Sequence, residues 1–263
     1  MPELPEVETI VRGLRDLVGS QIERVEVNDP RLFLPKAKLV GAVISRIERK
    51  GKYLVCHLAD GASLLVHLRM SGRLVRSTTA KEKRHTRLSL YLDRGRIHFV
   101  DPRRLGTVQY SEDGFPVNLG IDPTERAFTR GRLARIVSAS RSPIKVLLMD
   151  QRRIAGIGNI YAAEALFRAG IDPRRLGKTL SRGEVTAAHA AVRTVLTEAI
   201  DQLGTTLGEG VSDYRQTSGQ RGGFQERLHV YSREGEACHR CGATIERTKQ
   251  GGRSTYFCPG CQH

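Results

Sequence analysis

The sequence lacks the features of a membrane-embedded or secreted protein. No apolar run approaches the roughly 20 residues that a membrane-spanning helix needs. Glu3 and Glu6 stand at the N-terminus, where a secretory signal would carry basic residues. Long runs of like charge and internal repeats are also absent. These absences exclude a spanning helix, a signal peptide and a charged tail, so we expect a cytoplasmic protein.

Acidic residues are few compared with basic ones. The 263 residues include 43 Lys and Arg against 28 Asp and Glu, a formal net charge of +15. Because the positive charges are dispersed, they favour a basic face on a folded protein over a solvated tail. Such a face is typical of proteins that bind nucleic acid, which indicates association with the nucleoid. A chain of this length also has enough residues for more than one module.

Cysteine is scarce, and its placement is informative. Four of the five cysteines form two C-x2-C pairs separated by residues 242–257, namely Cys238, Cys241, Cys258 and Cys261. Two such pairs complete a closed tetrahedral site, so we predict one structural Zn²⁺ with no open position for substrate. Two disulfides are the alternative, but they suit a secreted protein. The glycines at 251 and 252 predict a hairpin turn between the pairs, and Cys56, in an apolar run, predicts a buried strand residue.

The first eight residues, Met-Pro-Glu-Leu-Pro-Glu-Val-Glu, carry a possible nucleophile. If Met1 is removed, as we expect before a small residue, Pro2 becomes a free secondary amine beside Glu3. An α-amino pKa of about 7.7 to 8.0 leaves a useful neutral fraction at about pH 7. Attack of this amine on a sugar carbon would give an iminium, a permanently charged electron sink. A disordered N-terminus is the alternative, but the helical pattern that follows weakens it.

Periodicity predicts an α+β protein in three parts. Apolar spacing predicts a helix from Val7 to Val18, and short alternating runs between Gln21 and Tyr110 predict an antiparallel sandwich or barrel. A linker follows at 111–124. Helices are then expected at 130–140, 143–150, 160–169 and 182–203. Residues 208–223, polar and glycine-rich, predict a mobile loop. The expected domains are 1–124, 125–228 and 229–263.

Several internal segments have both a functional and an ordinary interpretation. Gly156-Ile157-Gly158-Asn159 opens a helix, where backbone N–H groups bind phosphate and Asn159 can cap; many helices begin this way. Asp101-Pro102-Arg103-Arg104 predicts a sharp turn that presents two guanidinium groups, or simply a solvated charged turn. Lys52, at a strand start, is a candidate phosphate ligand or a surface lysine. Met70, at a turn tip among arginines, has the character of a DNA wedge.

Taken together, these segments resemble bacterial formamidopyrimidine-DNA glycosylases, which excise oxidised purines such as 8-oxoguanine and then cleave the abasic site. The resemblance runs from the N-terminal Pro-Glu through Arg49-Lys50-Gly51-Lys52 and Met149-Asp150 to the four-cysteine finger. It implies an N-terminal β-sandwich with flanking helices, a helix–two-turn–helix module and a zinc β-hairpin, with DNA crossing the cleft between the halves. The implied partner is double-stranded DNA containing oxidised purines or abasic sites, bound by a monomer.

The resemblance also implies roles for individual residues. Pro2 would attack C1′ of the damaged nucleotide, Glu3 would pass a proton to the sugar ring oxygen, and Lys52 would contact phosphate and assist β-elimination. Arg253 would bind phosphate and assist δ-elimination. The implied DNA-contacting residues are His85, Arg103, Arg141, Asn159, Met70 and Leu105. Residues 208–223 would cover the flipped base.

This sequence differs from the family pattern at one position, and two alternative functions stay open. Leu105 stands where the family often has an aromatic wedge, which predicts altered lesion interrogation without loss of catalysis. Endonuclease VIII-like enzymes, which prefer oxidised pyrimidines, share the N-terminal proline but usually have glycine at the position of Leu4. A non-catalytic zinc-ribbon protein that binds nucleic acid by charge would fit the composition, but it would give no role to Pro2 or Lys52.

Overall fold

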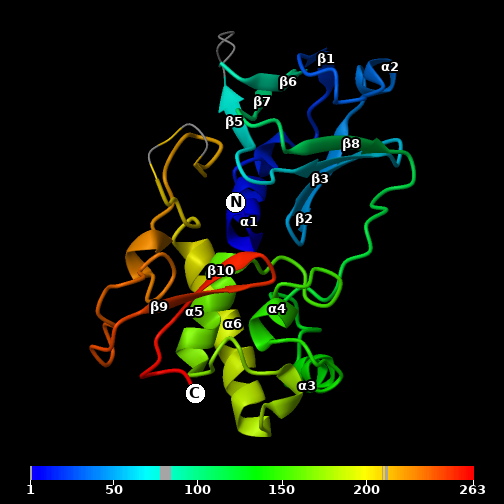
Figure 1. Ribbon diagram of the computed structural model, residues 1–263. Helices are drawn as coiled ribbons and strands as arrows, with labels where there is room; N and C mark the ends of the chain where they lie inside the picture. The colour runs from blue at the N-terminus through cyan, green and yellow to red at the C-terminus, as the bar shows by residue number, and fades with distance from the viewer. Residues whose placement is uncertain (1, 78–83, 209, 211–212) are drawn as a thin grey trace. The chain divides into compact units, whose positions relative to one another are not determined.

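The computed structural model describes residues 2–77, 84–208, 210 and 213–263, which form two compact units (Figure 1). The first unit extends to Val117 and includes Gln202–Gln225, while the second comprises Asn118–Asp201 and Glu226–His263. The domain boundaries expected at 124 and 228 stay predictions, as does the removal of Met1, which lies outside the described residues. Across the described ranges, no helix has the length and apolar character needed to cross a membrane.

The first unit contains two four-stranded antiparallel sheets, as the alternating apolar runs predict. One sheet has the order β1-β6-β7-β5 and the other β2-β3-β4-β8. The bounds are β1 Ile22–Val27, β2 Ile44–Lys50, β3 Tyr53–Leu58, β4 Ser63–His67, β5 Arg73–Ser77, β6 Thr86–Leu92, β7 Gly95–Val100 and β8 Thr107–Ser111, with helix α2 at Lys36–Leu39. Apolar side chains from both sheets meet in one core. Cys56 belongs to it, and burial raises the pKa of its thiol to about 12, so the prediction of a buried strand cysteine is confirmed.

The first helix is shorter than predicted at one end and longer at the other. Helix α1 spans Leu4–Arg12, followed by a 3₁₀ turn η1 at Arg15–Leu17. Pro5 is tolerated because it lies in the first turn, where its missing N–H has no helical partner. The helix ends at Gly13, where an added Cβ would lie 2.7 Å from Thr217 Oγ1. The predicted extension to Val18 was therefore wrong, because Gly13 terminates the helix.

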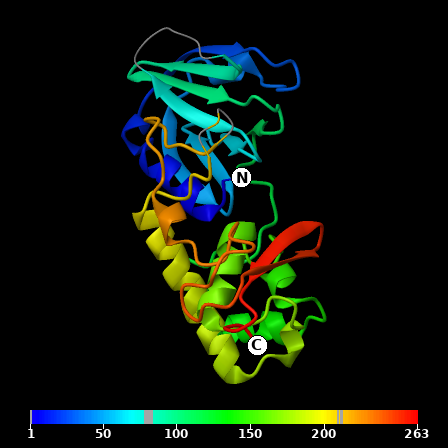
Figure 2. The ribbon, with the colours of Figure 1, turned by 60° about the vertical axis from the view of Figure 1, so that its left-hand side comes forward.

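The second unit is helical and ends in the zinc hairpin. Its elements are α3 Arg130–Ser138, α4 Ile144–Leu148, α5 Asn159–Ala169, the 3₁₀ turn η2 Gly177–Thr179, α6 Arg182–Asp201, β9 Glu246–Gln250 and β10 Arg253–Phe257; η3 spans Phe224–Arg227. The β9–β10 hairpin packs beside α5 (Figure 2). Apolar residues of the finger, including Val230 and Ile245, share a buried cluster with Ala163 and Phe167 of α5. The finger is therefore an integral layer of this unit.

Candidate active site

The N-terminal Pro2-Glu3 segment is buried and held by a carboxylate. Glu3 is the residue before α1 and has 1% of its surface exposed. Its backbone N–H donates to Glu6 Oε2 at 2.7 Å, and the other oxygen of Glu6 accepts from the Thr205 N–H at 2.8 Å. Gly204 precedes this contact with a φ of +82°, and a Cβ there would lie 2.8 Å from Glu6 Oε1. The segment is thus fixed in place, contrary to the expectation for a disordered terminus.

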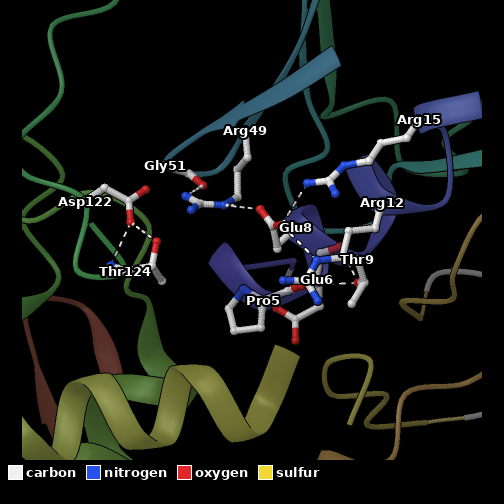
Figure 3. A network of polar contacts seen from close by, with 10 residues as sticks. All are labelled: Pro5, Glu6, Glu8, Thr9, Arg12, Arg15, Arg49, Gly51, Asp122 and Thr124. Atoms are coloured by element: carbon white, nitrogen blue, oxygen red, sulfur yellow. Dashed lines mark hydrogen bonds and ion pairs between the residues drawn. The ribbon is translucent and has the colours of Figure 1, made fainter. Parts of the chain in front are cut away.

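A second set of polar contacts joins α1 to the turn that carries Lys52 (Figure 3). Arg49, at the end of β2, pairs through Nε with Glu8 Oε2 of α1 at 3.1 Å and donates to the Gly51 carbonyl at 3.4 Å. Glu8 also accepts from Arg12 at 2.9 Å. Lys52 follows directly and has only 7% of its surface exposed. It is therefore not an ordinary surface lysine, and the start of α1 and the β2–β3 turn are tied together.

The expected wedge residues lie on exposed turns, as predicted. Met70, between β4 and β5, and Leu105, between β7 and β8, each have 44% of their surface exposed, and Arg103 is also exposed. Beneath them lies Asp101, which is fully buried. Because exposed apolar side chains on rigid turns are suited to entering a base stack, this arrangement fits a DNA wedge.

Asp101 connects these two loops to each other and to the residue His85, which precedes β6. Its carboxylate accepts from the Gly106 N–H at 2.7 Å, from the Arg103 N–H at 3.2 Å and from the Ser71 hydroxyl beside Met70. Its own N–H donates to the His85 carbonyl at 3.1 Å. Thus the buried Asp101, through its carboxylate and its backbone N–H, joins the loops of Met70, Arg103, Leu105 and His85 into a single cluster, a role that the sequence motif did not reveal.

The backbone of this cluster is strained. Arg69, His85 and Arg104 have φ values of +52°, +72° and +54°, a region that residues with a Cβ rarely adopt. Each such residue costs on the order of 1–3 kcal/mol and persists only where the surroundings enforce it. Gly106 could not carry a side chain, because a Cβ would lie 2.6 Å from the ring of Phe99. The hydrogen bonds of Asp101 to the loop N–H groups are among the contacts that hold these turns in this conformation.

In the second unit, a buried lysine orients Asn159. Lys145 has 1% of its surface exposed, and its ammonium donates to Asn159 Oδ1 at 2.6 Å, Thr255 Oγ1 at 2.7 Å and the Ser254 carbonyl at 2.9 Å. An ammonium only donates, so the amide oxygen faces it and the NH₂ group points elsewhere as a donor. The prediction that Asn159 caps α5 was wrong, because Gly158 is the cap and Asn159 is the first helical residue.

The finger brings its four cysteine sulfurs together. All four Sγ atoms lie within 4.8 Å of one another, with Cys238–Cys261 at 3.9 Å and Cys241–Cys258 at 3.4 Å. Zn–S bonds of about 2.3 Å in a tetrahedron place sulfurs roughly 3.8 Å apart, so the set fits one Zn²⁺. Gly251 and Gly252, with φ values of +53° and +76°, form the predicted hairpin turn.

The hairpin turn leaves Arg253 exposed, next to Ser254, which Lys145 holds. Arg141 is exposed between α3 and α4, and no contact within the described residues links it to Asn159 or Arg253. The predicted site residues are therefore divided: seven lie in the first unit, and Arg141, Asn159, Arg253 and the cysteines lie in the second. The supporting residues Glu6 and Lys145 were missed, because nothing in the sequence marks a buried ion.

Comparison with known proteins identifies the family. Residues 1–108 match the formamidopyrimidine-DNA glycosylase N-terminal domain, 119–209 its H2TH domain, and 235–263 the zinc finger found in FPG and IleRS. Formamidopyrimidine-DNA glycosylases from Gluconobacter oxydans and Pelotomaculum thermopropionicum are 44% and 43% identical, covering all of this chain and 100% and 99% of their own lengths.

Solved structures agree with this assignment. The MutM (Fpg) protein from Thermus thermophilus superposes with a TM-score of 0.91 at 41% identity, covering 99% of this chain and 98% of that one. Lactococcus lactis Fpg in complex with DNA containing an abasic site gives 0.90 at 34% identity, with 99% of both chains covered. The predicted α+β fold and the structural zinc site are confirmed. The chain belongs to the formamidopyrimidine-DNA glycosylase family of zinc-finger DNA repair enzymes.

Proposed function

We propose that this chain excises oxidised purines, such as 8-oxoguanine and formamidopyrimidines, with Pro2 as the nucleophile and then cleaves the abasic site. The observation that carries the proposal is the buried Pro2-Glu3 segment, which Glu6 fixes and which the Glu8–Arg49 pair connects to the turn of Lys52. Such rigid positioning is what a nucleophile needs to attack one atom of a bound substrate. A protein that binds DNA by charge alone would have no use for it.

In the proposed reaction, the Pro2 nitrogen forms a bond to C1′ as the bond from C1′ to the base breaks, and the base leaves with the bonding electrons and takes a proton from water. Glu3 takes the proton that the Pro2 nitrogen loses and passes it to the sugar ring oxygen as the ring opens, leaving an iminium on Pro2. The iminium acidifies the C2′ hydrogen, so β-elimination breaks the strand 3′ to the lesion, with Lys52 holding phosphate and assisting proton transfer. Arg253 binds phosphate for the subsequent δ-elimination on the 5′ side. The closed four-thiolate zinc site takes no part in these steps.

Damaged DNA must be opened before this chemistry begins, because a base in a duplex is unreachable. Unstacking costs a few kcal/mol, and least for a damaged pair. We assign Met70, Leu105 and Arg103 to the gap left by the flipped base, with Arg103 facing the orphaned cytosine. His85, Asn159 and Arg141 would bind phosphates, with the Asn159 NH₂ group oriented by Lys145. The bound form would be a monomer on double-stranded DNA, since one lesion needs one active site.

The segment Gly208–Gly223 would cover the flipped base. Residues 209, 211 and 212 lie outside the described residues, but Tyr214 is buried and its hydroxyl lies 2.5 Å from Thr9 Oγ1 of α1. This contact would keep the segment attached to α1, the helix that follows Pro2 and Glu3. Replacing residues 208–213 by a glycine-serine linker should reduce the preference for 8-oxoguanine over an abasic site. Unchanged preference would remove the assignment.

Oxidised pyrimidines are the second candidate substrate. A complex of Lactococcus lactis Fpg, 34% identical to this chain, contains DNA with an oxidised pyrimidine. Against this candidate, Leu4 is fully buried in the first turn of α1, where the pyrimidine-specific group usually has glycine. We therefore expect oxidised pyrimidines to be poorer substrates than 8-oxoguanine.

Borohydride trapping tests the mechanism. The protein, with a free Pro2 verified by mass spectrometry, is mixed with a duplex carrying one 8-oxoguanine opposite cytosine and then reduced. We expect a covalent adduct that maps to Pro2 and is absent from Pro2→Gly and from protein that retains Met1. If no adduct forms, the same test on an oxidised pyrimidine distinguishes a different lesion preference from the absence of imine chemistry. Failure on both lesions would contradict the proposed function.

A further inference from the structure

The second unit contains a pocket that the proposed reaction does not use. It has a volume of about 510 Å³ and lies between α3, η2 and the start of α6, within the range of roughly 300–1,000 Å³ that is typical of ligand sites. Val137 and Val185 are buried at its floor, and Ala134 and Leu180 are partly exposed beside them. None of its lining residues comes from α4, α5 or the hairpin, which carry Lys145, Asn159 and Arg253 in this unit.

The floor of the pocket is fixed by close backbone packing. The Gly177 N–H donates to the Ser142 carbonyl at 3.0 Å, and a Cβ on Gly177 would lie 2.9 Å from the Val137 carbonyl oxygen. Helix α3 begins at a Thr129 cap, whose hydroxyl accepts from the Arg132 N–H at 3.2 Å. Because Gly177 leaves no room for a side chain against the Val137 carbonyl, η2 and α3 pack with their backbones close together, and the pocket is a feature of the folded backbone.

The rim of the pocket is basic. Arg130, Arg135, Lys178 and Arg182 line it and are exposed. Within the part of the chain that the structure describes, these four form no ion pair, and the lining contains no acidic residue. Cations around a concave apolar surface focus a positive potential into it. The rim therefore attracts an anionic ligand.

The nearest acid in the sequence does not neutralise this rim. Glu184, in the first turn of α6, pairs bidentately with Arg175 and accepts from the Ser181 N–H at 2.7 Å. These contacts hold the pKa of its carboxyl at about 2, chiefly through the hydrogen bond from Arg175. Its negative charge is paired with Arg175, which does not line the pocket, so it does not neutralise the cations of the rim.

We propose that this pocket binds an acidic peptide segment of a partner protein, with a large apolar side chain of the peptide on the floor and its carboxylates on the rim. Charge complementarity selects an anion, and the apolar floor selects the kind of anion. A DNA backbone gains from the cations but has no large apolar side chain to place on Val137 and Val185, and phosphate contacts need no cavity. An acidic peptide with an aromatic or leucine side chain satisfies both parts.

Fluorescence anisotropy on the full-length, zinc-loaded protein tests the proposal. The probe is a labelled synthetic peptide of three aspartates followed by leucine and phenylalanine, and the control peptide has alanine at the two apolar positions. We expect the probe to bind at least about tenfold more tightly than its control, because only the probe can fill the floor. Equal binding of the two peptides would overturn the proposal, since charge alone would then explain it, and so would absence of binding at millimolar protein.

Two variants and one matched control assign the binding to this pocket. Lys178→Glu reverses a rim charge, and Ala134→Trp fills the cavity without changing charge. Each variant should lower the affinity for the probe peptide by about tenfold or more. Arg132→Glu makes the same kind of charge reversal on an exposed position of α3 outside the lining and should have little effect. Circular dichroism confirms that each variant is folded.

DNA is the alternative occupant and gives a different result. If the surface belongs to the DNA-binding face, Lys178→Glu lowers the affinity for an undamaged 20-base-pair duplex, the duplex displaces the peptide, and Ala134→Trp leaves peptide binding unchanged. That pattern would overturn the proposal. The expected pattern is unchanged duplex affinity and unchanged lesion excision in Ala134→Trp, together with lost peptide binding. The test thus separates this pocket from the Pro2 chemistry.

Discussion

Two buried ionic groups, Asp101 in the first unit and Lys145 in the second, perform comparable tasks with opposite charge. Asp101 accepts hydrogen bonds from loop N–H groups and a hydroxyl, while Lys145 donates to a carbonyl, a hydroxyl and an amide oxygen. An acid suits a cluster of turns, whose N–H groups point inward without strand or helix partners. A lysine suits the gap between a helix and a hairpin, where the remaining groups are acceptors. An acid is therefore found where the unpaired backbone groups are N–H donors, and a lysine where they are carbonyl acceptors.

The two clusters also differ in what supports them. Asp101 contacts turns that connect the two sheets of the first unit, which share a large apolar core. Lys145 depends on β10, a strand of a two-stranded hairpin whose base is held by the four cysteines. A lone two-stranded hairpin is marginally stable in water, so the Lys145 contacts should depend on the metal and the Asp101 contacts should not.

Removal of zinc should have the largest effect and should separate the clusters. Structural zinc contributes an apparent ~10–16 kcal/mol in small zinc peptides, so a strong chelator should unfold the hairpin and release Ser254 and Thr255 from Lys145. Backbone amide NMR signals of residues 238–262 should collapse, while those of the loops around Asp101 keep their chemical shifts. Loss of both sets together would show that the first unit also needs the metal.

Substitution of Lys145 by methionine should come next. It keeps the aliphatic stem but leaves Asn159 Oδ1, Thr255 Oγ1 and the Ser254 carbonyl without their donor, at about 1–3 kcal/mol for a buried unsatisfied group. We expect the free energy of unfolding to fall by about 3–4 kcal/mol in urea titrations. Lys249→Met, on the exposed strand β9, is the matched control and should change it by less than about 0.5 kcal/mol. A similar loss from both variants would contradict the role given to Lys145.

Acid should lower the stability of the first unit, which contains the Asp101 cluster, because His67 must then bind a proton. Burial, reinforced by Arg69 and Lys52, lowers the pKa of His67 from 6.5 to about 4, and its Nδ1 accepts from the Arg69 N–H at 3.1 Å, next to Met70. The folded protein therefore holds His67 neutral while the unfolded chain binds a proton below pH 6.5. This stabilisation is complete above about pH 6.5 and is lost as pH falls towards 4, by about 2–3 kcal/mol.

Comparison of His67→Gln with the unmodified protein isolates this contribution. The variant should show a flatter dependence of unfolding free energy on pH between about 4 and 6.5, because glutamine does not titrate. NMR titration of the imidazole gives the pKa directly. A His67 pKa near 6.5 in the folded protein would remove the prediction.

Asp101→Asn should have a smaller effect on stability and a larger one on DNA handling. Asparagine keeps one acceptor oxygen but places an NH₂ group against donors, so the loss should be about 2 kcal/mol. Because the strained loops of Arg69 and Arg104 would relax, we expect excision of 8-oxoguanine to fall more than excision from a single-stranded or unpaired lesion, which needs no wedge. Equal losses on both substrates would indicate a general folding defect. Asp93→Asn, on an exposed turn, is the control.

The sequence predicted those features of the structure that depend on residues close together in the chain. The alternating runs gave the strands, the two glycines gave the hairpin turn, and cysteine spacing gave the zinc site, because each depends on a few neighbouring residues. The contacts that fix the site were hidden, since they join distant segments: Glu6 meets Thr205 and Lys145 meets Thr255. Even Asn159, correctly placed at a helix start, has its orientation set by Lys145 instead of by a cap. Burial of an ion is a tertiary property that no pattern of single residues carries.

The smallest predicted effect concerns Leu105, an exposed apolar residue of the Asp101 cluster. Leucine excludes water from a base step but offers no aromatic face, and stacking of a base on an aromatic side chain contributes about 1–3 kcal/mol in single-strand binders. Leu105→Phe should therefore lengthen residence on undamaged DNA, by about tenfold at most for a partly inserted ring, while the single-turnover rate of excision stays unchanged. Single-molecule diffusion on stretched DNA measures the residence time, with Leu176→Phe, an exposed leucine of the second unit, as the control. Because the turn of Leu105 is held by Asp101, the effect of Leu105→Phe should shrink in the Asp101→Asn background. Additive effects would mean that the wedge acts without the support of the buried carboxylate.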